Sequence, residues 1–164
     1  MNAEVSAYNF SRLFQETKGG PVTYNGLNLV MLDRFPAKPN EKLIVTIEST
    51  SSKYPQGVGV SEEVEVFGQK VKQAVVWEYF SLPPGKRSEV RSQLPYSFEV
   101  VCRNKKEHLS FYNMAELDGR HEWWTHASAM IVEEIPNGRR YRCNDFQPND
   151  DFNDIVFRVE RKAD

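Results

Sequence analysis

The stretch that decides the interpretation of this chain lies near its C-terminus, where an acidic, amide-rich turn leads directly into an apolar strand. It reads Asn144-Asp145-Phe146-Gln147-Pro148-Asn149-Asp150-Asp151-Phe152-Asn153-Asp154-Ile155-Val156-Phe157-Arg158-Val159. The Asp, Asn and Pro residues are typical of a turn, because their side chains hydrogen-bond local backbone and Pro presets φ. The aliphatic and aromatic residues that follow favour a β-strand. The stretch therefore predicts a β-rich domain with an unusually acidic turn.

The turn has the chemistry of a calcium site. Calcium binds six to eight oxygen atoms from carboxylates, amide carbonyls, backbone carbonyls and water. No His lies in the run and Cys143 stands only at its edge, so zinc or copper fits poorly. The loop also lacks the Gly and the terminal Glu of an EF-hand. The predicted ligands are Asp145, Asn149, Asp151 and Asp154, with Asp150 and Asn153 in reserve.

A turn without metal is the alternative interpretation. Asp150, Asp151 and Asp154 repel one another, so a folded loop that gathers them needs a positive partner. That partner is either a bound cation or one of the nearby arginines. The candidates are Arg139, Arg140, Arg142 and Arg158.

The segment 149–157 also resembles a known sequence pattern. It is similar to the Asp-x-Asp-Phe-Asn-Asp-(Val/Leu)-Val segment that closes a group of bacterial β-rich domains of unknown function, often found in secreted or surface proteins. The resemblance implies a calcium site, and Asn144-Asp145 stands where that pattern has an upstream acidic pair. Asn149 replaces the usual first Asp, which would weaken the site. The match covers only the C-terminal end of the chain.

Composition limits the class of protein. The chain has 164 residues, 40% hydrophobic and 12% aromatic, with a formal charge of −2. This length predicts one domain with a real core, and the charge gives no general attraction to nucleic acid or to anionic membranes. No apolar run is long enough for a membrane span. The N-terminus does not resemble a Sec signal peptide, which predicts a cytoplasmic protein or one exported by a leaderless route.

Hydrophobic alternation predicts the fold. Residues 4–17 have helical spacing, and Gly19-Gly20 would end that helix. The segment 1–20 is thus expected to precede a single domain over 21–164. About nine short alternating segments with little helix between them predict an all-β, antiparallel β-sandwich that is jelly-roll-like, with a small closed barrel as the alternative.

Three local expectations follow from the same patterns. Asn137-Gly138 predicts a type I′ hairpin turn that would place Glu133 opposite Arg142. The polar stretch from Ser49 to Ser61 predicts a mobile loop. The apolar run Val71–Phe80 predicts a central strand. Cys102 and Cys143 are either two buried thiols or one disulfide, and the sequence does not decide between them.

Aromatic residues mark a second candidate site. Tyr112, Trp123 and Trp124 could present a platform for a sugar or another flat ligand, although one of two adjacent tryptophans in a strand is expected to face the core. His121 and His126 are five positions apart, whereas a helical HExxH zinc motif needs four. No nucleophile stands in a recognisable catalytic motif.

The sequence therefore predicts a calcium-binding β-sandwich module with a structural or ligand-binding role, for which a glycan or a protein would be the partner. No catalytic residue is assigned. Two other hypotheses stay open, namely a metal-assisted hydrolase that uses the same site and a metal-free subunit of a bacterial protein assembly.

Overall fold

The protein is described by a computed structural model over residues 10–81, 87–89, 94–123, 127–147 and 151–162. This part of the chain forms one helix, α2 (Phe10–Glu16), and strands that alternate in direction. The strands are β1 (Val22–Tyr24), β2 (Leu27–Val30), β3 (Asp33–Pro36), β4 (Lys42–Thr50), β5 (Gln56–Val66), β6 (Gln69–Trp77), β7 (Tyr79–Ser81), β8 (Arg87–Glu89), β9 (Tyr96–Cys102), β10 (His108–Leu117), β11 (Arg120–Glu122), β12 (Ala129–Ile135), β13 (Gly138–Asn144) and β14 (Ile155–Arg161). The predicted all-β fold with a short N-terminal helix is confirmed. No helix within the described ranges has the length and apolar character needed to cross a membrane.

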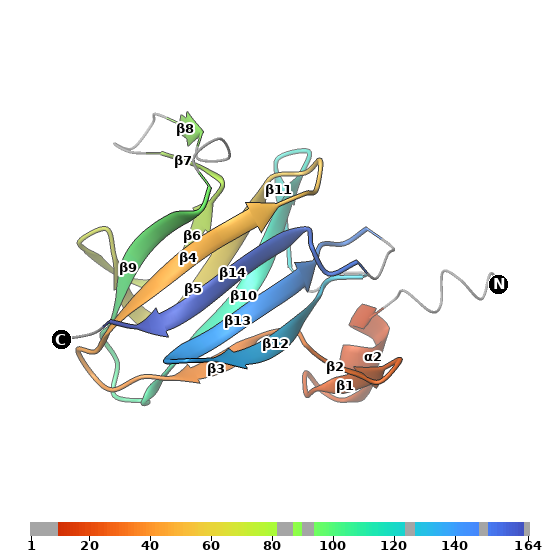
Figure 1. The fold of residues 1–164 in the computed structure, drawn as a ribbon, viewed down its shortest axis with the longest axis horizontal. Helices are drawn as coiled ribbons and strands as arrows, with labels where there is room; N and C mark the ends of the chain where they lie inside the picture. Colours follow the sequence, from red (N-terminus) through yellow and green to blue (C-terminus); the bar gives the residue numbers. More distant parts are fainter. Residues whose placement is uncertain (1–9, 82–86, 90–93, 124–126, 148–150, 163–164) are drawn as a thin grey trace.

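Twelve of the strands form one antiparallel sheet. Its order is β1-β2-β12-β13-β14-β4-β9-β5-β10-β11, with β3 paired to β10 and β6 paired to β5, while β7 and β8 form a separate pair. Figure 1 shows that the sheet curls on itself, so that β12, β13, β14 and β4 lie in front of β10, β5 and β6. The predicted antiparallel sandwich is thus built from two layers of one continuous sheet.

Strand β5 carries the chain from one layer to the other. Its first half pairs with β10, and its last residues, Val64–Val66, pair with β9. Between these halves the register shifts at Glu62 and Glu63, which have φ angles of 87° and 55°. A bulge of this kind bends a strand and increases its twist, and here it lets one strand serve both layers.

The main core lies between the two layers. Its largest members include Ile47 of β4, Tyr141 of β13 and Phe157 of β14 on one side, and Phe111 of β10 on the other. Tyr141 and Phe157 stack with ring centroids 4.7 Å apart. The two cysteines, Cys102 and Cys143, are buried free thiols in this core, so the thiol interpretation holds.

A second, smaller core attaches the helix to the sheet. Phe10 and Phe14 of α2 are fully buried against Leu29 of β2 and Phe152 of the acidic turn. Phe10 stacks on Phe152 with centroids 6.2 Å apart. The acidic turn is therefore held at one end of the sandwich by an aromatic residue in its own sequence.

Three local expectations are wrong. The β12–β13 hairpin pairs Ile135 with Gly138 and Glu133 with Arg140, so its two loop residues are Pro136 and Asn137 rather than Asn137 and Gly138. Pro presets the first central φ of a turn and Asn137 has φ 64°, which is the arrangement of a type II turn. Glu133 therefore meets Arg142 only diagonally, at 3.8 Å.

The other two corrections concern β5 and β6. The stretch 49–61 is largely strand, since β4 runs to Thr50 and β5 begins at Gln56, where residues 56–60 are buried. The run from Val71 to Phe80 is not a central strand, because β6 ends at Trp77 and pairs, among the described residues, only with β5.

Candidate metal centre

The acidic turn is the connection between β13 and β14. These strands pair from Gly138 with Glu160 to Cys143 with Ile155, and residues 145–154 connect them. The neck is closed by two hydrogen bonds, in which the Asp154 N–H donates to the Cys143 carbonyl (3.0 Å) and the Asp145 N–H donates to Asp154 Oδ2 (2.9 Å). Asp145 and Asp154 are thereby brought together across the neck.

Asn144 stabilises the path of the turn rather than facing a ligand. Its Oδ1 accepts a hydrogen bond from the Phe152 N–H at 2.7 Å, and its backbone carbonyl accepts one from Asn113 Nδ2 at 2.7 Å. Phe152 has φ 52°, an uncommon conformation for a bulky residue. This conformation lets Phe152 turn inward to the helix while Asp151 and Asn153 on either side stay exposed.

Asp145 is fully buried and surrounded by donors. Its Oδ2 accepts hydrogen bonds from the Ser52 hydroxyl (2.5 Å) and from Gln56 Nε2 (3.1 Å), and its Oδ1 accepts one from the Gln147 N–H (2.9 Å). A carboxylate with this many donors is stable inside a protein. These hydrogen bonds join the turn to Ser52 and to Gln56, the first residue of β5.

The pKa of Asp154 is raised in the neck of the turn. Burial is the main cause that raises the pKa of Asp154 to about 7, and the neighbouring carboxyl groups of Asp145 and Asp151 contribute to this rise, against the lowering effect of the hydrogen bond from the Asp145 N–H. The side chain is only 5% exposed. Burial disfavours the charged form of Asp154, and nearby carboxyl groups add to this effect, so part of the population keeps the proton near neutral pH.

The buried side-chain oxygen of Gln56 accepts no hydrogen bond. The side chain is 0% exposed, its Nε2 donates to Asp145 Oδ2 and to the Tyr54 carbonyl, and its Oε1 has no hydrogen-bond partner. A buried acceptor without a donor is uncommon in folded proteins and calls for an ion, a water molecule or another explanation.

The structure places the predicted ligands unequally. Asp145 and Asp154 form a buried pair, Asp151 and Asn153 are exposed on the same turn, and Asn149 and Asp150 lie outside the described residues. Within the ranges that the structure describes, no three His, Cys, Asp or Glu side chains come together as a metal cluster. A cation held here would therefore need amide, hydroxyl or backbone oxygens as well as carboxylates, which calcium accepts.

Sequence reasoning missed Ser52 and Gln56. They lie 93 and 89 residues before Asp145, in the stretch predicted to be a mobile loop. Neither residue type nor spacing marks them locally. Only the pairing of β14 with β4, which places Ser49 and Thr50 beside Val156 and Ile155, brings this stretch to the turn.

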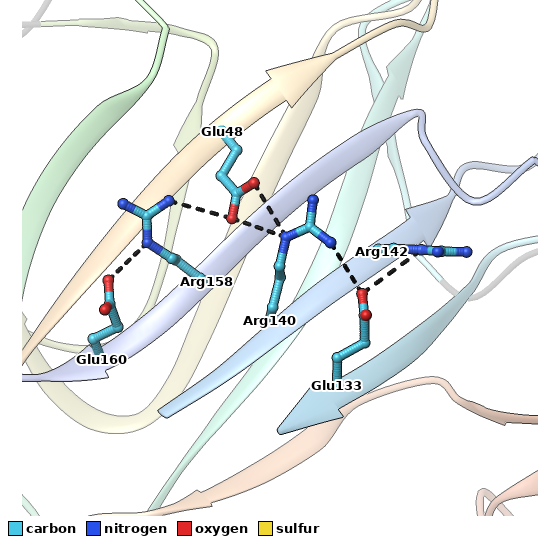
Figure 2. Close-up of polar contacts among 6 residues, drawn as sticks. All are labelled: Glu48, Glu133, Arg140, Arg142, Arg158 and Glu160. Atoms are coloured by element: carbon cyan, nitrogen blue, oxygen red, sulfur yellow. Dashed lines mark hydrogen bonds and ion pairs between the residues drawn. The ribbon is translucent and has the colours of Figure 1, made fainter. Parts of the chain in front are cut away.

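The arginines that could have neutralised the turn have other partners. Arg139 pairs with Asp33 (2.8 Å) and Glu134 (2.9 Å). The other three arginines alternate with three glutamates in a row of charged side chains on the outer surface of β4, β12, β13 and β14, shown in Figure 2. Its members are Glu48, Glu133, Arg140, Arg142, Arg158 and Glu160.

Glu48 is the centre of this row. Its two oxygens share the Arg140 Nε–H as acceptors, each at 3.1 Å, and Arg158 Nη1 lies 3.3 Å from Glu48 Oε2. Glu133 and Glu160 bind the same arginines from the outside, at 3.0 and 2.7 Å. Three carboxylates balance three guanidiniums, so the row stabilises the sheet surface without leaving a net charge.

Replacing Glu48 by alanine is expected to lower the free energy of unfolding by about 1 kcal/mol, because it removes the carboxylate that two partly exposed arginines share. Urea unfolding in low salt would measure the loss, which should shrink in 1 M NaCl as the charges are screened. Glu134→Ala serves as the control, since that side chain is 75% exposed. An equal loss for both variants would contradict a central role for Glu48.

The second candidate site is partly assembled. Tyr112 and Trp123 pack with ring centroids 4.8 Å apart, but Tyr112 is only 3% exposed, so Trp123 rather than Tyr112 could offer a surface to a ligand. Trp124 and His126 lie outside the described residues, and His121 is in strand β11, where its ring lies 4.7 Å from that of Trp77.

Comparison with known proteins adds little to this description. No family model matches the chain, and no curated protein is similar to it in sequence. Among solved structures, the C-terminal domain of the BC2L-C lectin from Burkholderia cenocepacia is similar with a TM-score of 0.44 and 12% identity, over 80% of this chain and 96% of that domain. This likeness is too distant to assign a function to the chain.

Proposed function

We propose that this chain is a β-sandwich binding module that takes a calcium ion at the turn between β13 and β14. The observation that carries the proposal is the buried pair of Asp145 and Asp154, joined by the hydrogen bond from the Asp145 N–H to Asp154 Oδ2. Carboxylate oxygens are the ligands that a hard cation such as calcium takes, and Gln56, which hydrogen-bonds Asp145, has a buried amide oxygen without a donor. The raised pKa of Asp154 supports the same proposal, since burial first and the neighbouring carboxyl groups second disfavour its charged form, which a bound cation would favour.

The residues of the turn divide into two groups in this proposal. Asp145 and Asp154 would hold the ion from the neck, and Asp151 would reach it from the exposed arm, with Asn149, Asp150 and Asn153 as further oxygen donors. A bound calcium ion would supply the positive charge that offsets the repulsion between these carboxylates. Because Asp145 also binds Ser52 and Gln56, the ion would join the turn to the start of β5. The role proposed is therefore structural, and it would fix the end of the sandwich where a ligand or partner can bind.

The test is thermal unfolding of the chelator-stripped protein with and without calcium, with magnesium as the control. A ligand at 100 times its dissociation constant adds about 2.7 kcal/mol, which corresponds to a rise of roughly 5–10 °C in the midpoint for a chain of this size. We expect that rise with calcium and a much smaller one with magnesium, which demands a stricter octahedral geometry. No rise with calcium would overturn the proposal and would favour a metal-free assembly subunit.

Two double variants test whether the acidic turn causes the calcium-dependent rise in the unfolding midpoint. Asp151→Ala combined with Asp154→Ala should abolish the rise, and Asp151→Ala with Asp154→Asn should do the same while keeping a side chain that can accept the hydrogen bond from Asp145. Glu134→Gln removes an exposed carboxylate outside the turn and should leave the calcium response unchanged. A full response in both double variants would place the ion elsewhere.

A further inference from the structure

The outer surface of the other layer carries a polar row that crosses four strands. The register of β3, β10, β5 and β6 places Arg34 beside Ser110, Ser110 beside Ser61, and Ser61 beside Gln73. These side chains point the same way, because facing residues of paired strands share one face of a sheet. A guanidinium, two hydroxyls and an amide therefore stand in line.

An aromatic wall lies next to this row. Tyr112 faces Gly59 across the β10–β5 pair, and a Cβ atom at Gly59 would lie 2.0 Å from the Tyr112 ring, so the ring lies directly on the glycine. Gln73 Nε2 donates to the Tyr112 hydroxyl at 2.5 Å. Trp123 packs on the ring of Tyr112 and donates from Nε1 to the Met31 carbonyl at 3.3 Å. The glycine and these hydrogen bonds fix the orientation of both rings.

The bulge in β5 adds a carboxylate to the rim. Glu62 stands at the register shift with φ 87°, and Lys106 Nζ lies 2.5 Å from its Oε2. Bulges commonly re-aim a side chain at the border of a functional site, and a non-glycine residue in this backbone region is strained. Here the bulge directs Glu62 to the edge of the cavity between the polar row and the aromatic wall.

The cavity enclosed by these groups is about 290 Å³ in volume and is lined by Arg34, Ser61, Glu62, Gln73, Tyr112 and Trp123, among others. Pockets for small molecules run from about 300 Å³ upward and combine aromatic walls with a few polar groups. The size suits a single ring. The lining carries one guanidinium, Arg34, and one carboxylate, Glu62, which Lys106 already contacts, so a cation finds no free carboxylate there and most lining polar groups are neutral hydrogen-bonding groups.

We propose that this cavity binds a neutral polyhydroxylated ring, of the size of one sugar residue. Each hydroxyl of such a ring both donates and accepts, which matches the donors of Arg34 and Gln73, the acceptor Glu62 and the hydroxyls of Ser61 and Ser110. The apolar face of the ring would lie on Trp123. All these residues belong to β3, β5, β6, β10 or the segment after β11, so the site is separate from the acidic turn and does not depend on the calcium proposal.

The test is a titration of the full chain with neutral monosaccharides, including hexoses, pentoses and their methyl glycosides, followed by calorimetry and by ¹H–¹⁵N chemical shifts. A ligand of about a dozen heavy atoms is expected to bind with a dissociation constant on the order of millimolar. Shifts should gather at residues 34, 61, 73, 110 and 123. They should be the same in chelator and in calcium, so a failure of the calcium proposal would leave this result intact.

Two variants keep the proposal open to refutation. Trp123→Ala should weaken binding at least tenfold, and Gln73→Ala, which changes an exposed side chain and should not disturb folding, should weaken it severalfold. Gln69→Ala alters another exposed glutamine of β6 outside the cavity and should bind as the wild type does. No binding by any sugar of the panel, tighter binding of sulfated or acidic sugars, or binding unaffected by both cavity variants would each overturn the proposal.

Discussion

Replacement of Gly138 by alanine is expected to lower the free energy of unfolding by about 3 kcal/mol or more, a larger loss than most single substitutions cause. The reason is a backbone contact. A Cβ atom at this position would lie 1.9 Å from the Val159 carbonyl oxygen and 2.9 Å from the Val159 carbonyl carbon. Because these atoms belong to the neighbouring strand, no side-chain rotation relieves the clash, and β13 and β14 would have to separate. Urea unfolding would measure the loss.

Gly68→Ala is the matched control for that experiment. Gly68 also lies at a hairpin, between β5 and β6, but nothing stands within 4 Å of its Cβ position and its φ is 78°. Alanine there meets only the left-handed backbone penalty of about 1–2 kcal/mol. Equal losses for the two variants would show that β14 yields to the added methyl group, against the expectation.

Gly138 also shows why the sequence predicted a hairpin but not its register. The dipeptide Asn137-Gly138 is the usual signal for a two-residue type I′ turn, and the strands on either side are where it predicts them. Pro136 changes the outcome, because its ring presets φ for the first central position of a type II turn. Gly138 is then needed for its missing side chain beside Val159 rather than for a positive φ. That need depends on β14, which local sequence does not reveal.

Strand β6 shows a different limit of sequence analysis. Its apolar residues predicted a central strand, yet among the described residues it pairs with β5 alone. The apolar character has another cause. A Cβ atom at Gly57 would lie 2.8 Å from Trp77 and 2.9 Å from Val75, so these side chains cover the glycine on the surface of the sheet. An apolar pattern in the sequence indicates that side chains are covered. It does not show whether the strand has a neighbouring strand on each side or only side chains packed on its face.

Only those residues of the candidate metal centre that lie in the acidic turn could be predicted from the sequence. Asp145 and Asp154 could be named because both belong to one acidic run, and the structure brings them together through the β13–β14 pair. Ser52 and Gln56 could not be named, since their approach depends on β14 lying beside β4. Tyr112 and Trp123 could be named together from their aromatic character, but Gly59 and Gln73 reach the proposed cavity only through strand register, and Glu62 only through the bulge in β5.

The second large effect is expected in the pH dependence of stability without calcium. The pKa of Asp154 in the folded protein is about 7, well above its ordinary value of 3.8. The folded state therefore holds this proton more tightly than the unfolded state, so the stability contributed by Asp154 is lost as the pH rises from about 4 to about 7. The full loss is at most about 4 kcal/mol, from 1.36 kcal/mol per pKa unit.

Asp154→Asn should remove that loss. The amide is neutral at every pH, its oxygen can accept the Asp145 N–H, and its NH₂ can donate to the Asp145 carboxylate, as the protonated acid does. In chelator, the unfolding free energy of the variant minus that of the wild type should thus rise by up to about 4 kcal/mol between pH 4 and pH 8. Chemical unfolding at several pH values would measure this difference.

Calcium gives this prediction its control. An ion on the ionised pair offsets the repulsion in the wild type, whereas the variant lacks one of the two buried carboxylates and should gain little. Adding calcium at pH 8 should therefore reduce the advantage of the variant or reverse it, and Asp151→Asn, at an exposed position, should retain most of the wild-type pH dependence. A difference between variant and wild type that stays constant from pH 4 to pH 8 would mean that Asp154 ionises freely in the fold. The like charges of the neck would then already be compensated by the donors around Asp145, and the turn would have no need of a cation.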